Sequence, residues 1–193
     1  MLLNYAATHP DAILRYKRSG MILHLHSDAS YLSAPKAGSR AGRYFFLSNG
    51  SLDNAPSNGA VHVVAKIMKN VLSSAAEAEV GNAFNNAQEA CPIPQTLIEM
   101  GHPQPATPIQ TDNKWAEGIL TGTKKQKRSK AIDMRFYWLK DRIEQDQLTI
   151  YWRPGITNKG DYFTKHHPAL HHRAKCAKYI HESVQATNLP TQQ

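Results

Sequence analysis

The sequence predicts an α/β protein with a mixed β-sheet whose first three strands form an antiparallel meander. Two observations support this prediction. Three strand-like segments precede the first long helix, and strand-like and helical segments alternate afterwards, in the order β-β-β-α-β-α-β with a helix toward the C-terminus. A chain of 193 residues is long enough for one domain with a substantial core.

The first predicted strand is MILHLHSDASYLS, residues 21–33, where apolar and polar residues alternate. This period of two is typical of a strand that buries at least one face. The alternation leads to Asp28, which we expect at the far end of the strand. Residues 42–50 and 60–70 are rich in aromatic and β-branched residues and predict two further strands, joined by a loop with two Asn-Gly pairs.

Helical spacing of small and apolar residues predicts a helix over residues 73–90, capped by Ser73 or Ser74 and stopped by CPIP. A short helix over residues 95–101 follows. This region therefore forms the first helical layer over the predicted sheet.

The second half of the chain alternates strands and helices. TPIQTDN predicts a short strand that again ends on an acid, Asp112, and residues 114–122 predict a helix. Apolar residues at helical spacing predict a further helix over residues 129–145, and residues 147–154 predict the last strand.

The amino-acid composition indicates which kind of partner the protein binds. Lys and Arg outnumber Asp and Glu by 23 to 15, which gives a net charge of +8 and favours a polyanionic partner. Cys91 and Cys176 are far apart and form no CxxC pair, so we expect neither a disulfide framework nor a structural zinc site, and a reducing compartment fits best. No apolar run approaches the roughly 18 residues of a membrane span, so no membrane partner is expected.

Four acids occur in the order strand, helix, strand, and opening of a last helix: Asp28, Glu79, Asp112 and Asp161. Acids that follow neighbouring parallel strands meet at one edge of a sheet. A cluster of carboxylates suits two-metal phosphodiester cleavage, because two Mg²⁺ ions about 4 Å apart need hard oxygen ligands. A single Asp at a strand end is more often a turn former or helix cap, so the prediction depends on the order of all four acids along the chain.

The motifs LHSDASYLS, SSAAEAEV, IQTDN, KRSKAIDMRFYWLKD and NKGDYFTK resemble the ribonuclease H region of the copia-type retrotransposon polyprotein, over about residues 1–172. The resemblance implies a ribonuclease H-like fold, with a mixed five-stranded sheet, its first, fourth and fifth strands parallel, and helices on both faces. It also implies a metal-dependent endonuclease that hydrolyses the RNA strand of RNA·DNA hybrids during reverse transcription. The implied catalytic residues, holding two Mg²⁺ or Mn²⁺ ions, are Asp28, Glu79, Asp112 and Asp161.

The same resemblance divides the chain into a connection-segment remnant at residues 1–20, a ribonuclease H-like domain at 21–168 and a basic, His-containing tail at 169–193. In the family a reverse transcriptase polymerase domain precedes this region. We therefore expect a fragment or a decayed remnant of a larger element, found in cytoplasmic retroelement particles or in the nucleus. Related cellular ribonucleases H carry a His in the loop before the last acid, whereas YWRPGITNKGD has none, so slow turnover is expected.

Two glutamates compete for the helix position. Glu77 and Glu79 lie roughly 80° to either side of the centre of the apolar face, so a helical wheel does not choose between them. The family pattern, an Ala-Glu pair followed by an apolar residue, matches 78–80 and favours Glu79. Glu77 is then expected to be a solvated residue at the flank of the helix's apolar face.

Two other functions compete with this interpretation. A degenerate copy would keep the fold as a catalytically inactive nucleic-acid-binding or structural module. The four acids argue against this function, because clustered carboxylates repel one another and a module without catalysis has no use for them. A strand-transferring recombinase would carry its Glu on a helix after the second Asp, where Glu117 is the only nearby acid and the segment is short.

The basic segment KKQKRSK is predicted to contact nucleic-acid phosphates, with a solvated basic loop as the competing interpretation. Its charged residues are Lys124, Lys125, Lys127, Arg128 and Lys130. Four aromatic residues are expected in the core rather than stacked on bases, namely Trp115, Tyr137, Trp138 and Trp152. His24 and His26 are expected to be packed or hydrogen-bonded, because Mg²⁺ prefers oxygen.

Overall fold

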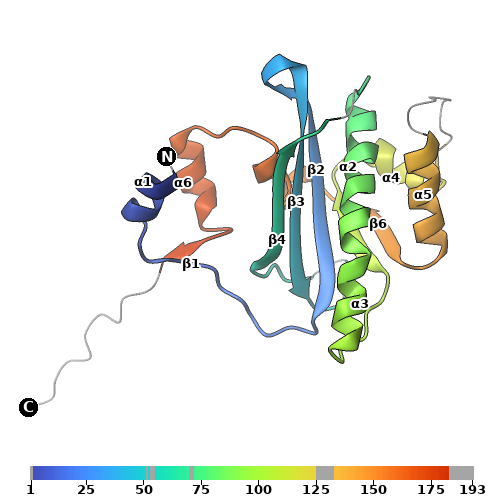
Figure 1. The fold of residues 1–193 in the computed structure, drawn as a ribbon, viewed down its shortest axis with the longest axis horizontal. Coiled ribbons are helices and arrows are strands. Elements are labelled where there is room, and N and C mark those ends of the chain that lie inside the picture. Colours follow the sequence, from blue (N-terminus) through green and yellow to red (C-terminus); the bar gives the residue numbers. More distant parts are fainter. Residues whose placement is uncertain (1, 51, 53–54, 70–71, 125–132, 183–193) are drawn as a thin grey trace, which may run out of the picture. The chain divides into compact units, whose positions relative to one another are not determined.

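The computed structural model describes residues 2–50, 52, 55–69, 72–124 and 133–182 (Figure 1). The chain forms two compact units, Arg18–His166 and a smaller one made of Met1–Lys17 and His167–Gln193. None of the described helices has the length and apolar character needed to cross a membrane. The sheet and all four predicted acids belong to the larger unit.

The smaller unit combines two helices with a short antiparallel ribbon of β1 and β7. Its elements are α1 (Leu2–Thr8), β1 (Ala12–Ile13), α6 (Ala169–Cys176) and β7 (His181–Glu182). Inside it, Tyr5 contacts α6, since His172 Nε2 lies 3.0 Å from the Tyr5 hydroxyl.

Five strands of the larger unit form one mixed sheet in the order β4-β3-β2-β5-β6. Their bounds are β2 (Ile22–Ala34), β3 (Gly38–Ser48), β4 (Ala60–Ile67), β5 (Thr107–Thr111) and β6 (Leu148–Trp152). β3 is antiparallel to β2 and β4, whereas β5 is parallel to β2 and β6. The predicted mixed five-stranded sheet with an antiparallel start is therefore confirmed.

The first strand is longer than expected. β2 continues to Ala34, so the prediction that the strand ends at Asp28 was wrong. The reason is that β2 keeps pairing with β3 up to Ser30 and again at Ala34, while β5 pairs with β2 only at Leu25 and His26. Asp28 therefore lies just past the end of the β2–β5 pairing, where one edge of β2 no longer has a neighbouring strand.

The α-helices of the larger unit are α2 (Ala75–Ala90), α3 (Pro92–Glu99), α4 (Lys114–Leu120) and α5 (Asp133–Glu144). The second helix begins at Pro92, earlier than expected, because proline at the first position of a helix lacks only an N–H that has no helical partner there. These helices bury one face of the sheet, whose core residues include Leu25, Phe45 and Ile109.

The opposite face of the sheet carries the alternate residues of the same strands, including His26, Tyr44 and Gln110. It is covered in part by two turns of 3-10 helix, η2 (Gly155–Thr157) and η3 (Asp161–Phe163). Tyr44 stacks with Phe163 of η3, and Gln110 bonds Thr157 of η2. The segment between β6 and α6 thus crosses the face that the long helices leave open.

The aromatic residues divide between core and surface. Trp115 and Trp138 pack against the core, as expected. Tyr137 is 62% exposed, so the prediction that it belongs to the core was wrong, because it lies on the outer side of α5. The indole of Trp152 is partly buried and donates a hydrogen bond of 2.9 Å to the backbone oxygen of Asp112.

Candidate metal centre

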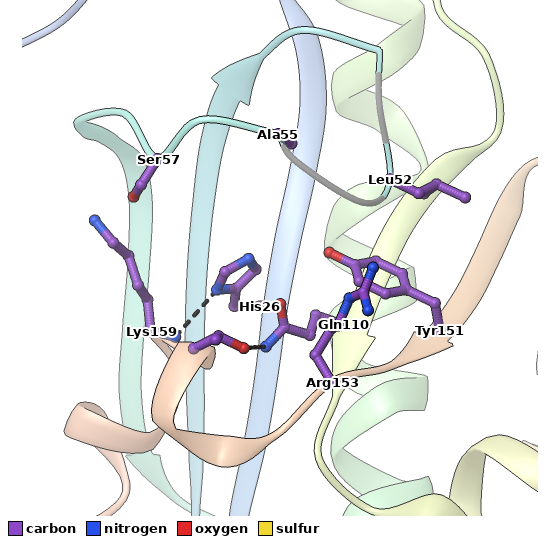
Figure 2. Close-up of a pocket in the computed structure, with 9 residues that line it drawn as sticks. His26, Leu52, Ala55, Ser57, Gln110, Tyr151, Arg153 and Lys159 are labelled. Atoms are coloured by element: carbon purple, nitrogen blue, oxygen red, sulfur yellow. Dashed lines mark hydrogen bonds between the residues drawn. The ribbon is translucent and has the colours of Figure 1, made fainter.

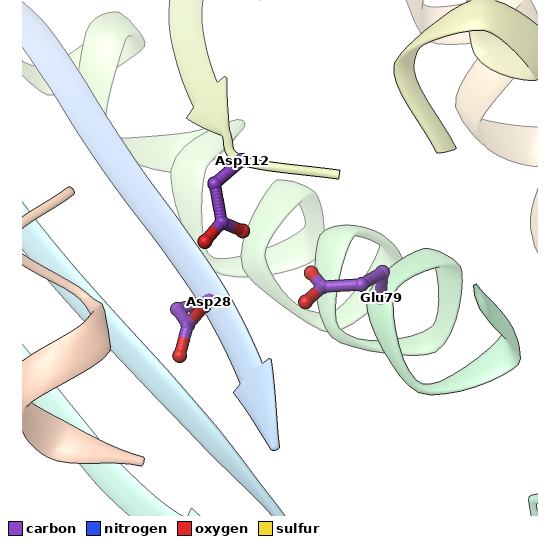
Figure 3. A group of neighbouring side chains, drawn as sticks. All are labelled: Asp28, Glu79 and Asp112. Atoms are coloured by element: carbon purple, nitrogen blue, oxygen red, sulfur yellow. The ribbon is translucent and has the colours of Figure 1, made fainter. Parts of the chain in front are cut away.

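Three of the four predicted acids converge beyond the carboxyl end of β5 (Figure 3). Asp28, Glu79 and Asp112 each offer a carboxylate oxygen, and these oxygens all lie within 4.8 Å of one another. They come from β2, α2 and the residue after β5. Segments separated by many residues thus place three hard oxygen ligands around one point, the type of site that binds Mg²⁺ or Mn²⁺.

Asp28 is held by the C-terminal part of the larger unit. Its side chain is 4% exposed, and its Oδ2 accepts a hydrogen bond of 2.5 Å from the Thr164 hydroxyl. Burial, together with repulsion from Asp112 and Asp161, raises the pKa of Asp28 to about 6, although the Thr164 hydrogen bond opposes this shift. The orientation of the carboxyl group is therefore fixed, and its surroundings contain little positive charge to compensate for its own negative charge.

Glu79 is buried on the face of α2 that meets β2. Its Oε1 accepts a hydrogen bond of 3.2 Å from the backbone N–H of Ala29. Its Oε2 is buried and has no hydrogen-bond partner among the described residues. Burial and the charges of Asp28 and Asp112 raise the pKa of Glu79 well above its ordinary value. An unsatisfied buried carboxylate oxygen is costly unless a cation or proton completes the site.

Asp112 lies between the end of β5 and the start of α4. Burial is the main cause of its raised pKa, and the charge of Asp161 adds to the shift. A Cβ at position 155 would lie only 2.7 Å from Asp112 Oδ2, so Gly155 provides the space for this carboxylate. The η2 turn therefore limits where the Asp112 side chain can point.

Asp161, the fourth predicted acid, stands outside the group of three. It begins η3 and forms an ion pair with Lys165. It is close enough for its charge to raise the pKa values of Asp28 and Asp112. For Lys165, burial lowers the pKa, but the hydrogen bond and charge of Asp161 outweigh it and the net shift is upward. Lys165 is thus a cation whose charge acts on this group of acids.

Asparagines on α2 align the helix with β2. Asn82 Nδ2 donates to the backbone oxygen of Asp28 at 2.6 Å, and Asn86 Nδ2 donates to the Ser27 hydroxyl at 2.5 Å. Both side chains are fully buried. Sequence analysis did not identify these positioning residues, and the only available signal was a polar residue on an otherwise small and apolar helix face.

The segment 158–164 is hydrogen-bonded to β2 and packs closely against β3. Asn158 Nδ2 donates to the backbone oxygen of Ser27 at 2.7 Å, and Ser30 Oγ donates to the Thr164 backbone oxygen at 2.8 Å. A Cβ at position 42 would collide with the Gly160 carbonyl oxygen, so Gly42 permits this close approach. These contacts bring Asp161 and Thr164 to the acids of β2 and α2.

Comparisons with known proteins agree with this geometry. No family model matches the chain. A retrovirus-related Pol polyprotein from transposon TNT 1-94 of Nicotiana tabacum is 27% identical over 109 residues, which make up 56% of this chain and 8% of that relative. The chain therefore corresponds to a small part of the curated relative that it matches.

Two solved structures share the architecture. LC11-RNase H1, isolated from compost by a metagenomic approach, superimposes with a TM-score of 0.55 at 12% identity, covering 74% of this chain and 92% of that one. The same enzyme in complex with an RNA/DNA hybrid gives a TM-score of 0.50, again at 12% identity, covering 74% and 91%. This chain has a ribonuclease H-like fold. The resemblance to the ribonuclease H region of a retrotransposon polyprotein is confirmed.

Within the ribonuclease H-like fold, the two helix glutamates have different surroundings. Glu79 faces the other acids, whereas Glu77 Oε2 accepts the backbone N–H of Ser73 at 2.7 Å and its own N–H donates to Ser74 Oγ at 3.1 Å. Glu77 is 7% exposed, so the prediction that it is a solvated flank residue was wrong. It belongs to the N-terminal cap of α2, where a glutamate in the first turn bonds unpaired backbone N–H groups.

The other predicted binding residues are only partly placed. Lys124 is exposed, and its Nζ donates to the backbone oxygen of Lys114 at 3.4 Å. The remaining predicted phosphate-binding residues, Lys125, Lys127, Arg128 and Lys130, lie outside the described residues. Glu117 is not among the acids that form the candidate metal centre in the described part of the chain.

Proposed function

We propose that this chain is a metal-dependent ribonuclease H that hydrolyses the RNA strand of RNA·DNA hybrids. The observation that carries the proposal is the convergence of Asp28, Glu79 and Asp112, whose carboxylate oxygens lie within 4.8 Å of one another in a ribonuclease H-like fold. Buried like charges at this distance destabilise the fold unless a cation binds them. A scaffold alone would have no use for such a cluster.

The residues present fit a divalent metal. All the candidate ligands are carboxylates, the donor type that Mg²⁺ and Mn²⁺ prefer, and Glu79 Oε2 is buried without a described partner. Asp28, Glu79, Asp112 and Asp161 would together hold two ions. When bound, such ions activate a water molecule as nucleophile and stabilise the leaving oxygen of the scissile phosphodiester.

The chain's own residues set the geometry of the centre. Thr164 orients the Asp28 carboxylate, and the Ala29 backbone N–H orients Glu79. Lys165 pairs with Asp161 and lies close enough to interact with the other acids. It therefore offsets part of their repulsion before a metal binds.

The substrate is proposed from the resemblance and from chemistry. RNA·DNA hybrids offer phosphates on both strands and 2′-hydroxyls on one strand only, and the 2′-hydroxyls are the feature by which a protein distinguishes RNA from DNA. A basic chain with an exposed Lys124 beside α4 suits phosphate contacts. Because the matched relative is a much longer polyprotein, we propose that a polymerase domain elsewhere in such a polyprotein helps to hold the hybrid.

The direct test is cleavage of a labelled RNA·DNA hybrid by the purified chain with Mg²⁺ or Mn²⁺, with and without chelator. We expect RNA fragments and intact DNA with metal, and no cleavage with chelator. Duplex DNA and duplex RNA serve as substrate controls and should remain uncut. Absence of hybrid cleavage with either metal, by a chain whose unfolding curve shows that it is folded, would support the inactive nucleic-acid-binding module instead.

A further inference from the structure

A cavity of about 360 Å³ lies on the face of the sheet opposite α2 (Figure 2). Its floor is a row of side chains from three adjacent strands. His26 of β2 is in register with Gln110 of β5, and Gln110 is in register with Tyr151 of β6. None of the four predicted metal ligands lines this cavity. The cavity is therefore built from residues other than those of the candidate metal centre.

The floor presents a hydrogen-bond donor and an acceptor from two buried residues. His26, 8% exposed, accepts the Lys159 backbone N–H at Nδ1 over 3.0 Å, so the neutral ring carries its proton on Nε2. Gln110, 3% exposed, donates from Nε2 to Thr157 Oγ1 over 3.1 Å, which leaves its Oε1 as an acceptor. Among the described residues, neither His26 Nε2 nor Gln110 Oε1 has a hydrogen-bond partner.

Two cationic side chains line the cavity. They are Arg153 and Lys159, and the lining residues that the structure describes include no acid. The Lys159 ammonium lies 4.7 Å from the centre of the Tyr44 ring, which holds this long side chain along the sheet face. Tyr151 adds an aromatic surface next to Arg153, as Figure 2 shows. A guanidinium, an ammonium and an aromatic ring are the groups that recognise phosphates and stack on bases.

We propose that this cavity binds a nucleotide, with its phosphate at Arg153 and its base edge on His26 and Gln110. Nucleobase edges carry hydrogen-bond donors and acceptors side by side and so match the floor. A purely apolar ligand would leave both buried polar groups unpaired, which is unfavourable. The nucleotide comes either from a free mononucleotide or from single-stranded nucleic acid. The proposal goes beyond the nuclease activity and does not depend on it.

The test uses the full chain with chelator present, so that the candidate metal centre holds no ion. Adenosine, guanosine, cytidine and uridine 5′-monophosphates are titrated separately by calorimetry, beside the four nucleosides and inorganic phosphate. At least one mononucleotide should bind saturably, and its nucleoside and inorganic phosphate should each bind at least about tenfold more weakly. Absence of saturable binding by all four, or inorganic phosphate binding as tightly as every mononucleotide, would overturn the proposal.

Substitutions distinguish a specific phosphate contact in the cavity from the effect of the protein's overall positive charge. Arg153→Gln should weaken mononucleotide binding by about tenfold and leave nucleoside binding unchanged. Lys140→Gln, which removes an exposed charge from α5, is the matched control and should bind like the parent. Gln110→Met should weaken nucleotide and nucleoside alike, and its unfolding curve checks that the sheet is intact. Parent-like binding by the Arg153 variant would overturn the assignment of this cavity.

A competition experiment distinguishes the two sources of the nucleotide. A short single-stranded oligonucleotide is added to the complex with the mononucleotide that binds best. If the oligonucleotide displaces the mononucleotide from the parent but not from Arg153→Gln, the cavity binds a nucleotide of single-stranded nucleic acid. Retention of the mononucleotide assigns the cavity to a free nucleotide. Both results support a nucleotide site.

Discussion

The Thr164 hydroxyl and the Asp28 carboxylate form a hydrogen bond of 2.5 Å although they are 136 residues apart in the sequence. Thr164 is fully buried, and its hydroxyl also lies 2.9 Å from the Asp161 backbone oxygen. This single side chain therefore joins β2 to the turn that carries the fourth acid. Four predictions concern this centre, and a fifth concerns the basic segment.

Thr164→Val should reduce hybrid cleavage by tenfold or more, because Asp28 loses the hydrogen bond that orients it, while Thr164→Ser should retain most of the activity. The Val variant should also raise the pKa of Asp28, since the Thr164 bond lowers it. Cleavage rates and carboxyl titration by NMR measure the two effects. A Ser variant as impaired as the Val variant would show that packing of the methyl group, rather than the hydroxyl, is what matters.

Asp28→Asn and Asp112→Asn should each abolish metal-dependent cleavage. In the presence of chelator their free energies of unfolding should equal or exceed that of the parent, because a repulsive cluster loses one charge. Chemical denaturation with chelator and a hybrid cleavage assay give both quantities. Asp141→Asn, which changes a half-exposed acid on α5, is the control and should cleave normally. Normal cleavage by both site variants would refute the metal-centre assignment.

Glu79→Gln should inactivate the enzyme, whereas Glu77→Gln should not, because the amide oxygen introduced by the second substitution still accepts the Ser73 N–H that caps α2. A further variant, Glu77→Ala, should lower the free energy of unfolding by about 1 kcal/mol and still cleave hybrid. Cleavage assays and urea denaturation test this contrast. If Glu77→Gln were inactive and Glu79→Gln active, the two roles assigned on α2 would be reversed.

The contribution of Asp28 to the stability of the metal-free protein should fall as pH rises from about 4 to about 6. Buried His26, whose pKa is lowered to about 3, contributes in the opposite direction, so the Asp28 contribution is measured as the difference between the parent and Asp28→Asn. The pKa of Asp28 is about 6 in the folded protein against an ordinary value of 3.8, so the folded state binds more protons in this window. Loss of those protons costs up to roughly 3 kcal/mol for Asp28. Urea denaturation with chelator across this range measures the slope.

Two comparisons make the pH test specific. As pH rises through this window, Asp28→Asn should gain stability relative to the parent, whereas Glu144→Gln, which alters an exposed acid, should keep the slope of the parent. Mg²⁺ should stabilise the parent more as pH rises through this window, because protons then no longer compete for the carboxylates. A stability difference between Asp28→Asn and the parent that does not grow between pH values of about 4 and 6 would contradict the raised pKa of Asp28.

Replacing Lys124, Lys125 and Lys127 together by Gln should weaken hybrid binding at low salt. It should also flatten the dependence of log affinity on log salt by roughly two, because each phosphate contact displaces a condensed counterion. The preference for hybrid over duplex DNA should survive, since phosphate contacts carry little of that discrimination. Binding measured over a range of salt concentrations tests this. A salt slope equal to that of the parent would leave this segment as a solvated basic loop.

The sequence by itself determined the type and order of the secondary structure and the identity of the acids. The alternation in β2 and the helical spacing in α2 are local patterns, and each reports which face of its element is buried. The order of Asp28, Glu79, Asp112 and Asp161, with the family resemblance, was sufficient to predict the fold. The two Asn-Gly pairs likewise predicted the loop between β3 and β4.

Only the tertiary structure decided which side chains meet. Asp28 lies within β2 because strand length depends on pairing with β3, and Glu77 is a cap because the chain before α2 folds back onto it. The hydrogen bonds of Asn86 and Thr164 join residues 59 and 136 positions apart. Such contacts leave no periodic signal in the sequence, because they arise only when separate elements pack against one another.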